Sequence, residues 1–437
     1  MATAGLHSSS THRSILDRLL ALFSVVHAGE GLSAVLLAAN VFLLLGTYYV
    51  LKTVREPLIL DHPNGAEIKS YASAGQALLF LLVVPLYGMI ASRVDRMKLV
   101  GGVTLFFVAN LGLFYVLGQA GVGIGVVYFL WVGIFSMLVV AQFWGFANDL
   151  YTEEQGKRLF PVIGVGASLG AWVGSVTAKN VYRELGPYHL MLASGAALCV
   201  CVLLTLVVHR REAGRSSEEK SREAAQPLDK TGGFQLVMRD RYLMGIALLV
   251  FLLSCVNTTG EYILGKFVTE SAQSLPAADR GAFIGEFYGD YFSWVNLVGF
   301  LIQIFLVSRI FKWIGVRGAL FVLPCIALGG YGILALVPVL AIVKVAKIME
   351  NSTDYSLNNT VRHALFLPTS REAKYKAKAA TDTFFVRAGD MTQAAIVYGG
   401  TQLSFTVGNF AVVNIVMVCF WLLVAGFVYR QHRRLSA

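Results

Sequence analysis

Charged residues are scarce in this chain. Asp, Glu, Lys and Arg make up 14% of its 437 residues, whereas a soluble globular domain carries about 25%. Cysteine is scarce too, and all five cysteines fall inside apolar runs, which argues against a disulfide framework or a zinc site. The eight histidines are scattered, with no pair at a helical metal-ligand spacing. These deficits exclude a disulfide scaffold, a disordered chain and an ordinary soluble enzyme, and we expect neither a metal nor a cofactor.

Long apolar runs fill most of the chain, which is 56% hydrophobic with a mean hydropathy of +0.64. A helix that spans a bilayer needs about 20 apolar residues. The runs are too long for barrel strands and do not alternate. We therefore predict an all-α integral membrane protein with twelve transmembrane helices in two six-helix halves. The predicted spans are 32–60, 70–91, 99–118, 122–147, 160–183, 188–209, 242–267, 283–308, 318–334, 338–362, 379–400 and 405–429.

The distribution of Lys and Arg predicts the orientation. The net charge of +10 would suggest a nucleic-acid partner in a soluble chain, but cytoplasmic loops of membrane proteins collect the same residues. With the N-terminus inside, 26 of the 36 Lys and Arg residues lie on the cytoplasmic side and seven in the outer halves. We expect a multi-pass protein of the bacterial inner membrane, with both termini cytoplasmic, a lipid bilayer around it and no nucleic acid bound.

One long polar connection divides the spans into six and six. Two landmarks repeat across it: Ser92-Arg93 matches Ser308-Arg309 at an offset of 216, and the segment from Thr152 matches that from Thr369 at 217. Such a duplication is typical of transporters whose site lies between the halves near mid-membrane. We expect a monomer with these parts: an N-terminal cytoplasmic segment (1–31), an N-terminal bundle (32–209), a linker (210–241), a C-terminal bundle (242–429) and a cytoplasmic tail (430–437).

Polar residues inside the predicted spans are the candidates for the site, because a charge in a span costs about 2.5–3.5 kcal/mol even on the lenient insertion scale. In the tenth span, Lys344, Lys347, Asn351, Asp354, Asn358 and Arg362 share one helix face that cannot lie against lipid. We predict an anion-binding wall between the halves. Its members are Lys52, Arg55, Lys344, Lys347, Arg387, Asn351 and Asp354.

Acidic residues in the spans are candidates for ion pairing or for coupling transport to ions or protons. They are Glu56, Glu261, Asp382 and Asp390. The alternative for any single charge is an internal ion pair, for example Lys52 with Glu56 at i and i+4. Aromatic residues such as Tyr48, Trp144 and Tyr355 can stack on a base or simply pack.

Three motifs have competing interpretations. Residues 88–98 resemble the cytoplasmic signature of the major facilitator superfamily, whose charges can hold one conformation, although positive-inside charge also explains them. Gly164, Gly166, Gly170 and Gly174 favour close packing of membrane helices. The segment 260–267 imitates a phosphate-binding loop, but no strand precedes it and the Ser/Thr is missing.

The fourth and fifth spans carry the segments 143–148 (FWGFAN) and 157–164 (KRLFPVIG). They resemble the ATP/ADP carrier family of plastids and obligate intracellular bacteria. The segments 51–56 (LKTVRE), 354–357 (DYSL) and 376–382 (KAKAATD) resemble parts of the same family. The resemblance implies a major-facilitator-like fold, exchange of ATP for ADP or nucleotide import, and a transport role for a first-helix cation that corresponds to Arg55 or else to Lys52.

The resemblance and the in-span charges together predict a secondary nucleotide transporter that works by exchange and is not an enzyme. Two positions differ from the family pattern: no acidic residue occurs around Val132, and Asp390 stands where lysine is frequent. A proton-coupled or facilitative transporter of another anionic or amphiphilic metabolite is therefore one alternative. A scaffold or sensor with a transporter fold is the alternative from another class.

Overall fold

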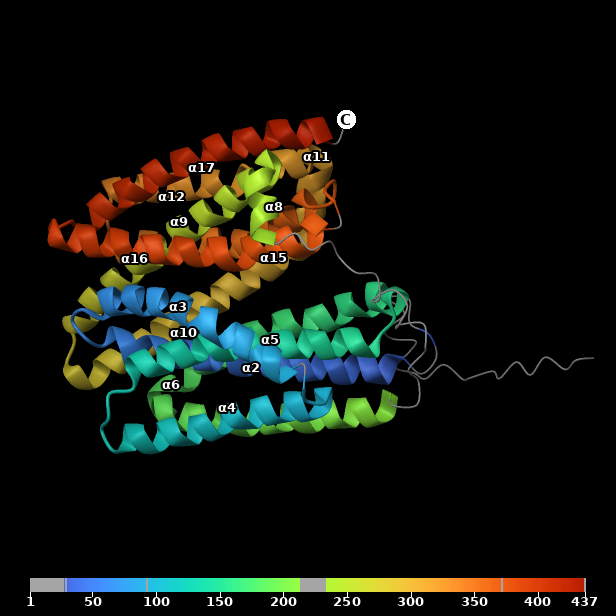
Figure 1. Ribbon diagram of the computed structural model, residues 1–437. Helices are drawn as coiled ribbons and strands as arrows, with labels where there is room; N and C mark the ends of the chain where they lie inside the picture. The colour runs from blue at the N-terminus through green and yellow to red at the C-terminus, as the bar shows by residue number, and fades with distance from the viewer. Residues whose placement is uncertain (1–26, 28–29, 92, 213–232, 371, 436–437) are drawn as a thin grey trace, which may run out of the picture.

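The computed structural model describes residues 27, 30–91, 93–212, 233–370 and 372–435. These residues form two helical bundles that follow one another in the sequence (Figure 1). The N-terminal bundle contains α2 (Gly31–Leu60), α3 (Gly65–Ala91), α4 (Arg96–Gln119), α5 (Gly125–Leu150) and α6 (Glu153–Glu212). The C-terminal bundle contains α8 (Gly233–Arg239), α9 (Arg241–Gln273), α10 (Ala277–Leu301), η1 (Ile302–Leu306), α11 (Val307–Ala319), α12 (Val322–Leu336), α13 (Leu340–Thr353), η2 (Asp354–Asn358), α14 (Asn359–Leu365), η3 (Ala373–Ala377), α15 (Lys378–Ala380), η4 (Thr381–Phe385), α16 (Val386–Gln402) and α17 (Val407–Leu435).

The prediction of an all-α membrane fold is confirmed, since the described residues contain no strand and eight helices long and apolar enough to cross a membrane. The longest of these bends at Gly186, where φ is 67°, so its two arms correspond to the predicted spans 160–183 and 188–209. The predicted spans 338–362 and 379–400 are helical but rich in charge and interrupted by the π-helical turns η2 and η4. The count of twelve therefore stays a prediction.

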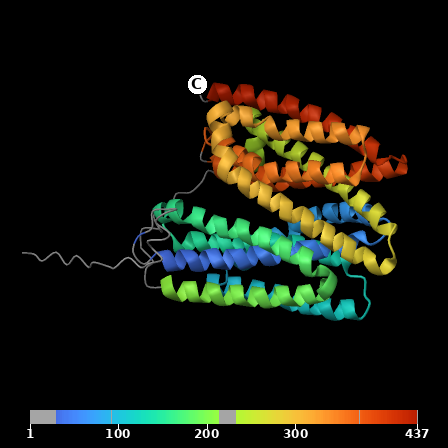
Figure 2. The same ribbon diagram turned by 180° about the vertical axis from the view of Figure 1, so that it is seen from behind.

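The expected linker 210–241 is partly helical. Residues 210–212 extend α6 and residues 233–239 form α8, beside η3, while residues 213–232 lie outside the described part of the chain, as does most of the expected segment 1–31. The start of α2 and the end of α17 lie on the same side of the molecule (Figures 1 and 2).

Glycines let α2 and α6 approach each other closely. A Cβ on Gly166, Gly170 or Gly174 would lie 2.2–2.5 Å from a carbonyl oxygen of α2, whereas one on Gly164 would meet nothing within 4 Å. The packing interpretation of this glycine series is thus confirmed for three of its four members.

The two bundles meet mainly at the side opposite the C-terminus and separate toward it (Figures 1 and 2). At the meeting side, Lys266 of α9 contacts Glu67 of α3 at 2.7 Å, and Arg183 of α6 contacts Glu286 of α10 at 2.6 Å. This arrangement leaves a cavity between the bundles.

Candidate functional site

The cavity between the bundles has two lobes that share Tyr48, Lys52 and Tyr355. The first, which we call the polar lobe, has a volume of about 330 Å³, and the second lobe has about 450 Å³. Both are in the size range of small-molecule sites, about 300–1,000 Å³. The polar lobe is lined by Tyr48, Lys52, Arg55, Lys69, Ser70, Ser73, Gln76, Phe129, Gly133, Ser136, Asn257, Thr258, Glu261, Tyr262, Phe292, Asn351, Tyr355, Arg387 and Gln393.

Lys52 of α2 stands where the two lobes join. Its Nζ lies 4.4 Å from the ring centre of Phe292 and 5.2 Å from that of Tyr49. No carboxylate within the described part of the chain lies within ion-pair distance of it. Aromatic faces attract a cation without neutralising it, so the positive charge of Lys52 remains available to an anion in the cavity.

Arg55 and Lys69 share one buried acid on α2. Glu56 is fully buried, and it accepts hydrogen bonds from Arg55 Nε at 3.0 Å and from Lys69 Nζ at 2.6 Å. Arg55 also lies over the ring of Phe129 at 4.6 Å. Two cations thus face the polar lobe while one carboxylate behind them compensates half of their charge.

Arg387 supplies a fourth cation from α16 in the C-terminal bundle. Its Nη1 is 3.0 Å from Oδ2 of Asp390, and Asp390 also accepts a hydrogen bond from Ser254 of α9 at 2.7 Å. The Arg387 guanidinium lies over the ring of Phe80 at 4.4 Å, and Phe80 belongs to α3 of the other bundle. Cations from both halves therefore line one cavity.

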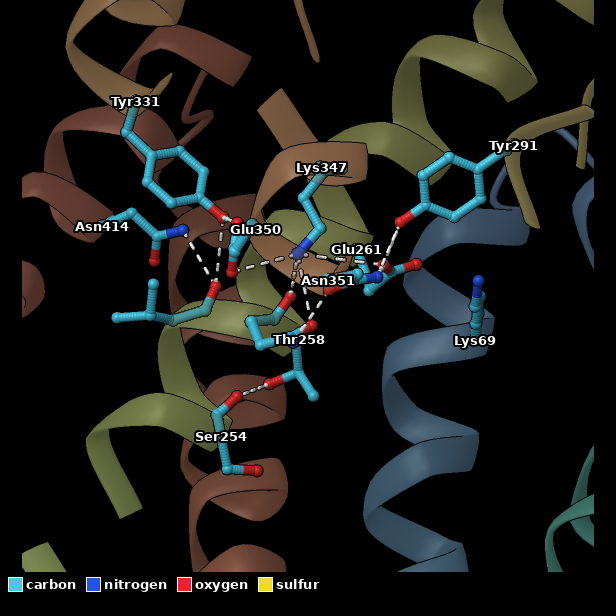
Figure 3. A network of polar contacts seen from close by, with 12 residues as sticks. Lys69, Ser254, Thr258, Glu261, Tyr291, Tyr331, Lys347, Glu350, Asn351 and Asn414 are labelled. Atoms are coloured by element: carbon cyan, nitrogen blue, oxygen red, sulfur yellow. Dashed lines mark hydrogen bonds and ion pairs between the residues drawn. The ribbon is translucent and has the colours of Figure 1, made fainter. Parts of the chain in front are cut away.

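Glu261 is the one acid in the lining of the polar lobe. It accepts hydrogen bonds from Asn351 Nδ2 at 2.9 Å and from the Tyr291 hydroxyl at 2.9 Å. Behind it, Lys347 lies 3.8 Å from Glu261 and 3.2 Å from Glu350 (Figure 3). Lys347 is 1% exposed, so it lies behind the cavity wall.

The TLC ATP/ADP transporter family matches the chain over residues 125–330 and 325–432. The chain belongs to this family. Among its relatives, ADP,ATP carrier protein 1 of Chlamydia pneumoniae is 25% identical over 66% of this chain and 64% of its own length. The chloroplastic ADP,ATP carrier protein 1 of Arabidopsis thaliana is 22% identical over 75% of this chain and 55% of its own. ADP,ATP carrier protein 5 of Rickettsia prowazekii is 21% identical over 98% of this chain and 100% of its own.

Solved transporter structures share the fold of this TLC family member. The nucleoside transporter NupG matches with a TM-score of 0.62 and 12% identity, over 92% of this chain and 98% of its own. The POT family transporter PepTSo matches with a TM-score of 0.64 and 11% identity, over 92% and 97%. The major-facilitator-like fold is thereby confirmed.

The matches to the chlamydial carriers span 56–64% of those carriers' length.

Of the predicted site residues of this TLC family member, the structure brings Lys52, Arg55, Glu261, Asn351 and Arg387 to the polar lobe. Glu56 and Asp390 lie directly behind them as ion partners. Lys52 does not pair with Glu56, because Arg55 and Lys69 occupy that carboxylate.

Four other predicted members lie apart from the polar lobe. Lys344 is held by Asp290 at 2.6 Å, and Lys347 is enclosed as described above. Asp354 accepts a hydrogen bond from Asn358 at 2.7 Å and lines a small adjoining cavity of about 140 Å³. This cavity shares Asn257 and Thr258 with the polar lobe. Asp382 is exposed on η4. The binding or coupling role of each residue stays a prediction.

Lys69 and Glu350 are two members of the site region that sequence reasoning missed. The predicted second span, 70–91, begins one residue after Lys69, but α3 begins at Gly65. Glu350 lies about 40° outside the stripe of the tenth span at 100° per residue. Its spacing of three from Lys347 was the available signal.

The signature at residues 88–98 serves the N-terminal bundle. Asp95 caps α4 by accepting hydrogen bonds from the backbone N–H groups of Met97 and Lys98, and Arg96 contacts Asp149 at the end of α5 at 3.1 Å.

The segment 260–267 does not form a phosphate-binding loop, because Gly260 and Gly265 lie inside the helix α9. Trp144 packs on Phe143 and Phe160 within the N-terminal bundle, whereas Tyr48 and Tyr355 line the cavity.

Proposed function

We propose that this TLC transporter carries nucleotides across the bacterial inner membrane, exchanging ATP for ADP by alternating access. The observation that carries the proposal is the polar lobe, where Lys52, Arg55, Lys69 and Arg387 from both halves face one cavity. In a bilayer-spanning protein such a surplus of cations is retained for an anionic substrate. The family membership favours a nucleotide as that anion.

The two lobes suit the two ends of a nucleotide. The polar lobe would hold the phosphates, because arginine binds phosphate oxygens with a two-pronged fork and lysine supplies a compact point charge. The second lobe is lined mostly by apolar and small residues, among them Leu45, Ala171 and Phe300. Tyr48 and Tyr355, at the junction, would stack on the base. Lys52 at the same junction would bind the phosphate nearest the ribose.

Alternating access would proceed by rocking of one bundle against the other. The inter-bundle ion pairs Lys266–Glu67 and Arg183–Glu286 would close the outer side. We place both termini and the 210–241 connection in the cytoplasm, on the basis of the Lys and Arg distribution. The structure then corresponds to an inward-facing state of a monomer.

The test uses the purified full chain in liposomes with radiolabelled ATP. With ADP inside, ATP uptake should rise at least about tenfold over empty liposomes. An exchanger needs a bound counter-substrate in order to return to the state that is open to external ATP. GTP, inorganic phosphate and glutamate in place of ATP define the substrate class. Uptake of a non-nucleotide anion with no uptake of ATP or ADP would contradict the proposal.

A further inference from the structure

Two carboxylates, the buried Glu350 and the partly exposed Glu261, converge on one ammonium inside the C-terminal bundle. Lys347 Nζ lies 3.2 Å from Glu350 Oε1 and 3.8 Å from Glu261 Oε1 (Figure 3). Across the residues that the structure describes, neither carboxylate has a second cation within ion-pair distance. One ammonium therefore serves two carboxylates, of which Glu350 is shielded from water, and a buried charge is costly unless it is fully compensated.

The two carboxylates differ in their surroundings. Glu261 lines the polar lobe, where Lys69 of α3 lies on its other side (Figure 3) and acts electrostatically on it. Glu350 is 2% exposed and faces no cation except Lys347. Its Oε1 has no hydrogen-bond partner. Glu350 is buried and depends on an ammonium that it shares with Glu261, so it is the group of this cluster that a proton would neutralise.

The groups that face Glu350 come from every helix packed around it. On its own helix α13 lies Lys347. From α12, the Tyr331 hydroxyl donates a hydrogen bond to Glu350 Oε2 at 2.8 Å. From α9, Glu261 adds negative charge, and from α17, the uncharged Asn414 donates to the Val256 carbonyl at 3.1 Å beside Tyr331. None of these groups adds a second positive charge beside Glu350.

We propose that Glu350 is a proton-binding site whose occupancy is coupled to an anion in the polar lobe. A proton adds to the Glu350 carboxylate from water on one side of the membrane and leaves to water on the other, and no other bond is made or broken. The protein would then take up a proton together with the anion in net transport. This inference rests on the proposed function only for its probe, ATP.

The coupling runs through Lys347, which contacts both acids. The charges that line the polar lobe, their ion partners and Glu350, which pairs with Lys347, comprise five cations and four carboxylates. The cations are Lys52, Arg55, Lys69, Lys347 and Arg387, and the carboxylates are Glu56, Glu261, Glu350 and Asp390. A proton on Glu350 frees Lys347 to compensate Glu261 and raises the positive surplus that an anion meets. By linkage, the anion must raise the affinity for the proton by the same factor.

The decisive variant is Glu350→Gln, which keeps the size of the side chain and an oxygen acceptor for Tyr331. Glu270→Gln is the matched control, because Glu270 is exposed on the same bundle in α9. In liposomes, wild type and the control should accumulate ATP when the interior is made alkaline, and a protonophore should abolish that accumulation. The Glu350→Gln protein should lose this response by about tenfold or more while it still exchanges ATP for ADP, because exchange needs no net proton movement.

A second measurement avoids transport. ATP added to the solubilised wild-type protein in weakly buffered solution should remove protons from the medium, and Glu350→Gln should remove about one fewer per protein. Tyr331→Phe, as a positioning variant, should shift the pH midpoint of this uptake without abolishing it.

The outcomes separate the two proposals. Exchange of ATP for ADP without any response to a pH gradient and without proton uptake overturns this inference and leaves the proposed function standing. An unchanged proton response in Glu350→Gln, or a response to a sodium gradient in its place, also overturns it. Absence of all nucleotide binding overturns the proposed function as well.

Discussion

Lys179 Nζ lies 2.5 Å from Asp290 Oδ1, and this contact joins α6 of the N-terminal bundle to α10 of the C-terminal bundle. The other oxygen of Asp290 is 2.6 Å from Lys344 of α13. One carboxylate is thus shared between a lysine of its own half and a lysine of the opposite half. If the halves separate here, Asp290 keeps Lys344 and releases Lys179.

Asp290→Asn should make the closed outer side open more often. The contact with Lys179 is partly exposed, so we expect it to contribute about 1 kcal/mol or less, which corresponds to about a fivefold change in the ratio of the two states. Labelling of a cysteine placed at Ala171, in the second lobe, by a membrane-impermeant reagent from outside should become faster. Labelling at the wild-type rate would show that this ion pair does not hold the closed state.

Lys52→Gln should weaken nucleotide binding more than it affects folding. The Lys52 side chain lines the cavity and has aromatic rings instead of an acid beside it, so its removal leaves no buried carboxylate unpaired. Loss of a charge-assisted contact of about 1.5–3 kcal/mol should raise the Kd for ATP about 10–100-fold. Isothermal titration calorimetry of the detergent-solubilised protein measures the Kd for ATP. The thermal midpoint of unfolding of the same protein measures the effect on folding.

Lys312→Gln is the matched control for that experiment, because Lys312 is exposed on α11 and lies outside both lobes of the cavity. Its Kd should equal that of the parent. Equal affinities of Lys52→Gln and Lys312→Gln would remove Lys52 from the site.

The membrane fold could be predicted from the sequence because every span must satisfy its backbone N–H and C=O groups by hydrogen bonds within its own helix. Long apolar runs in the sequence indicate such spans directly. The starts and interruptions of helices are harder to predict: α3 begins at Gly65, in a polar stretch, whereas the predicted span begins at residue 70 and leaves Lys69 outside it.

The partners of the in-span charges could not be predicted in the same way. Ion pairs such as Lys69–Glu56 and Lys344–Asp290 connect different helices, and their distances depend on how helices pack. Spacing along one helix suggested Lys52 with Glu56, but Arg55 and Lys69 reach that acid instead. Sequence therefore identified most of the charges of the site but not which of them remain free for an anion.

Acidification should weaken the anchor of α2 at Glu30. Burial alone would raise the pKa of the Glu30 carboxyl, but hydrogen bonds from Arg158, the His27 backbone and Gln155 outweigh it and lower the pKa from 4.5 to about 2. A lowered native pKa stabilises the fold fully above the ordinary value, and this stabilisation is lost as the pH falls from about 4.5 to about 2.

The difference in thermal midpoint between wild type and Glu30→Gln measures this effect in detergent. This difference should be largest at neutral pH and should shrink below about pH 4. The other titrating acids are the same in both proteins, so their contributions to the thermal midpoint cancel in the difference. A difference that does not change with pH would show that the Glu30 charge does not contribute.

Gly174→Ala should disrupt the contact between α2 and α6. A Cβ at Gly174 would lie 2.2 Å from the Gly46 carbonyl oxygen and 2.6 Å from its Cα, and these backbone atoms cannot rotate away as a side chain can. Overpacking of this kind costs about 1–3 kcal/mol.

Gly164→Ala, on the same helix, is the matched control because it adds a methyl group to open space. It should be neutral or slightly stabilising, since alanine favours a helix by about 1 kcal/mol over glycine. The thermal midpoints of the two variants in detergent should therefore move apart, downward for Gly174→Ala. Equal midpoints would mean that α2 and α6 do not depend on this close approach, and the glycine series would then have no packing role.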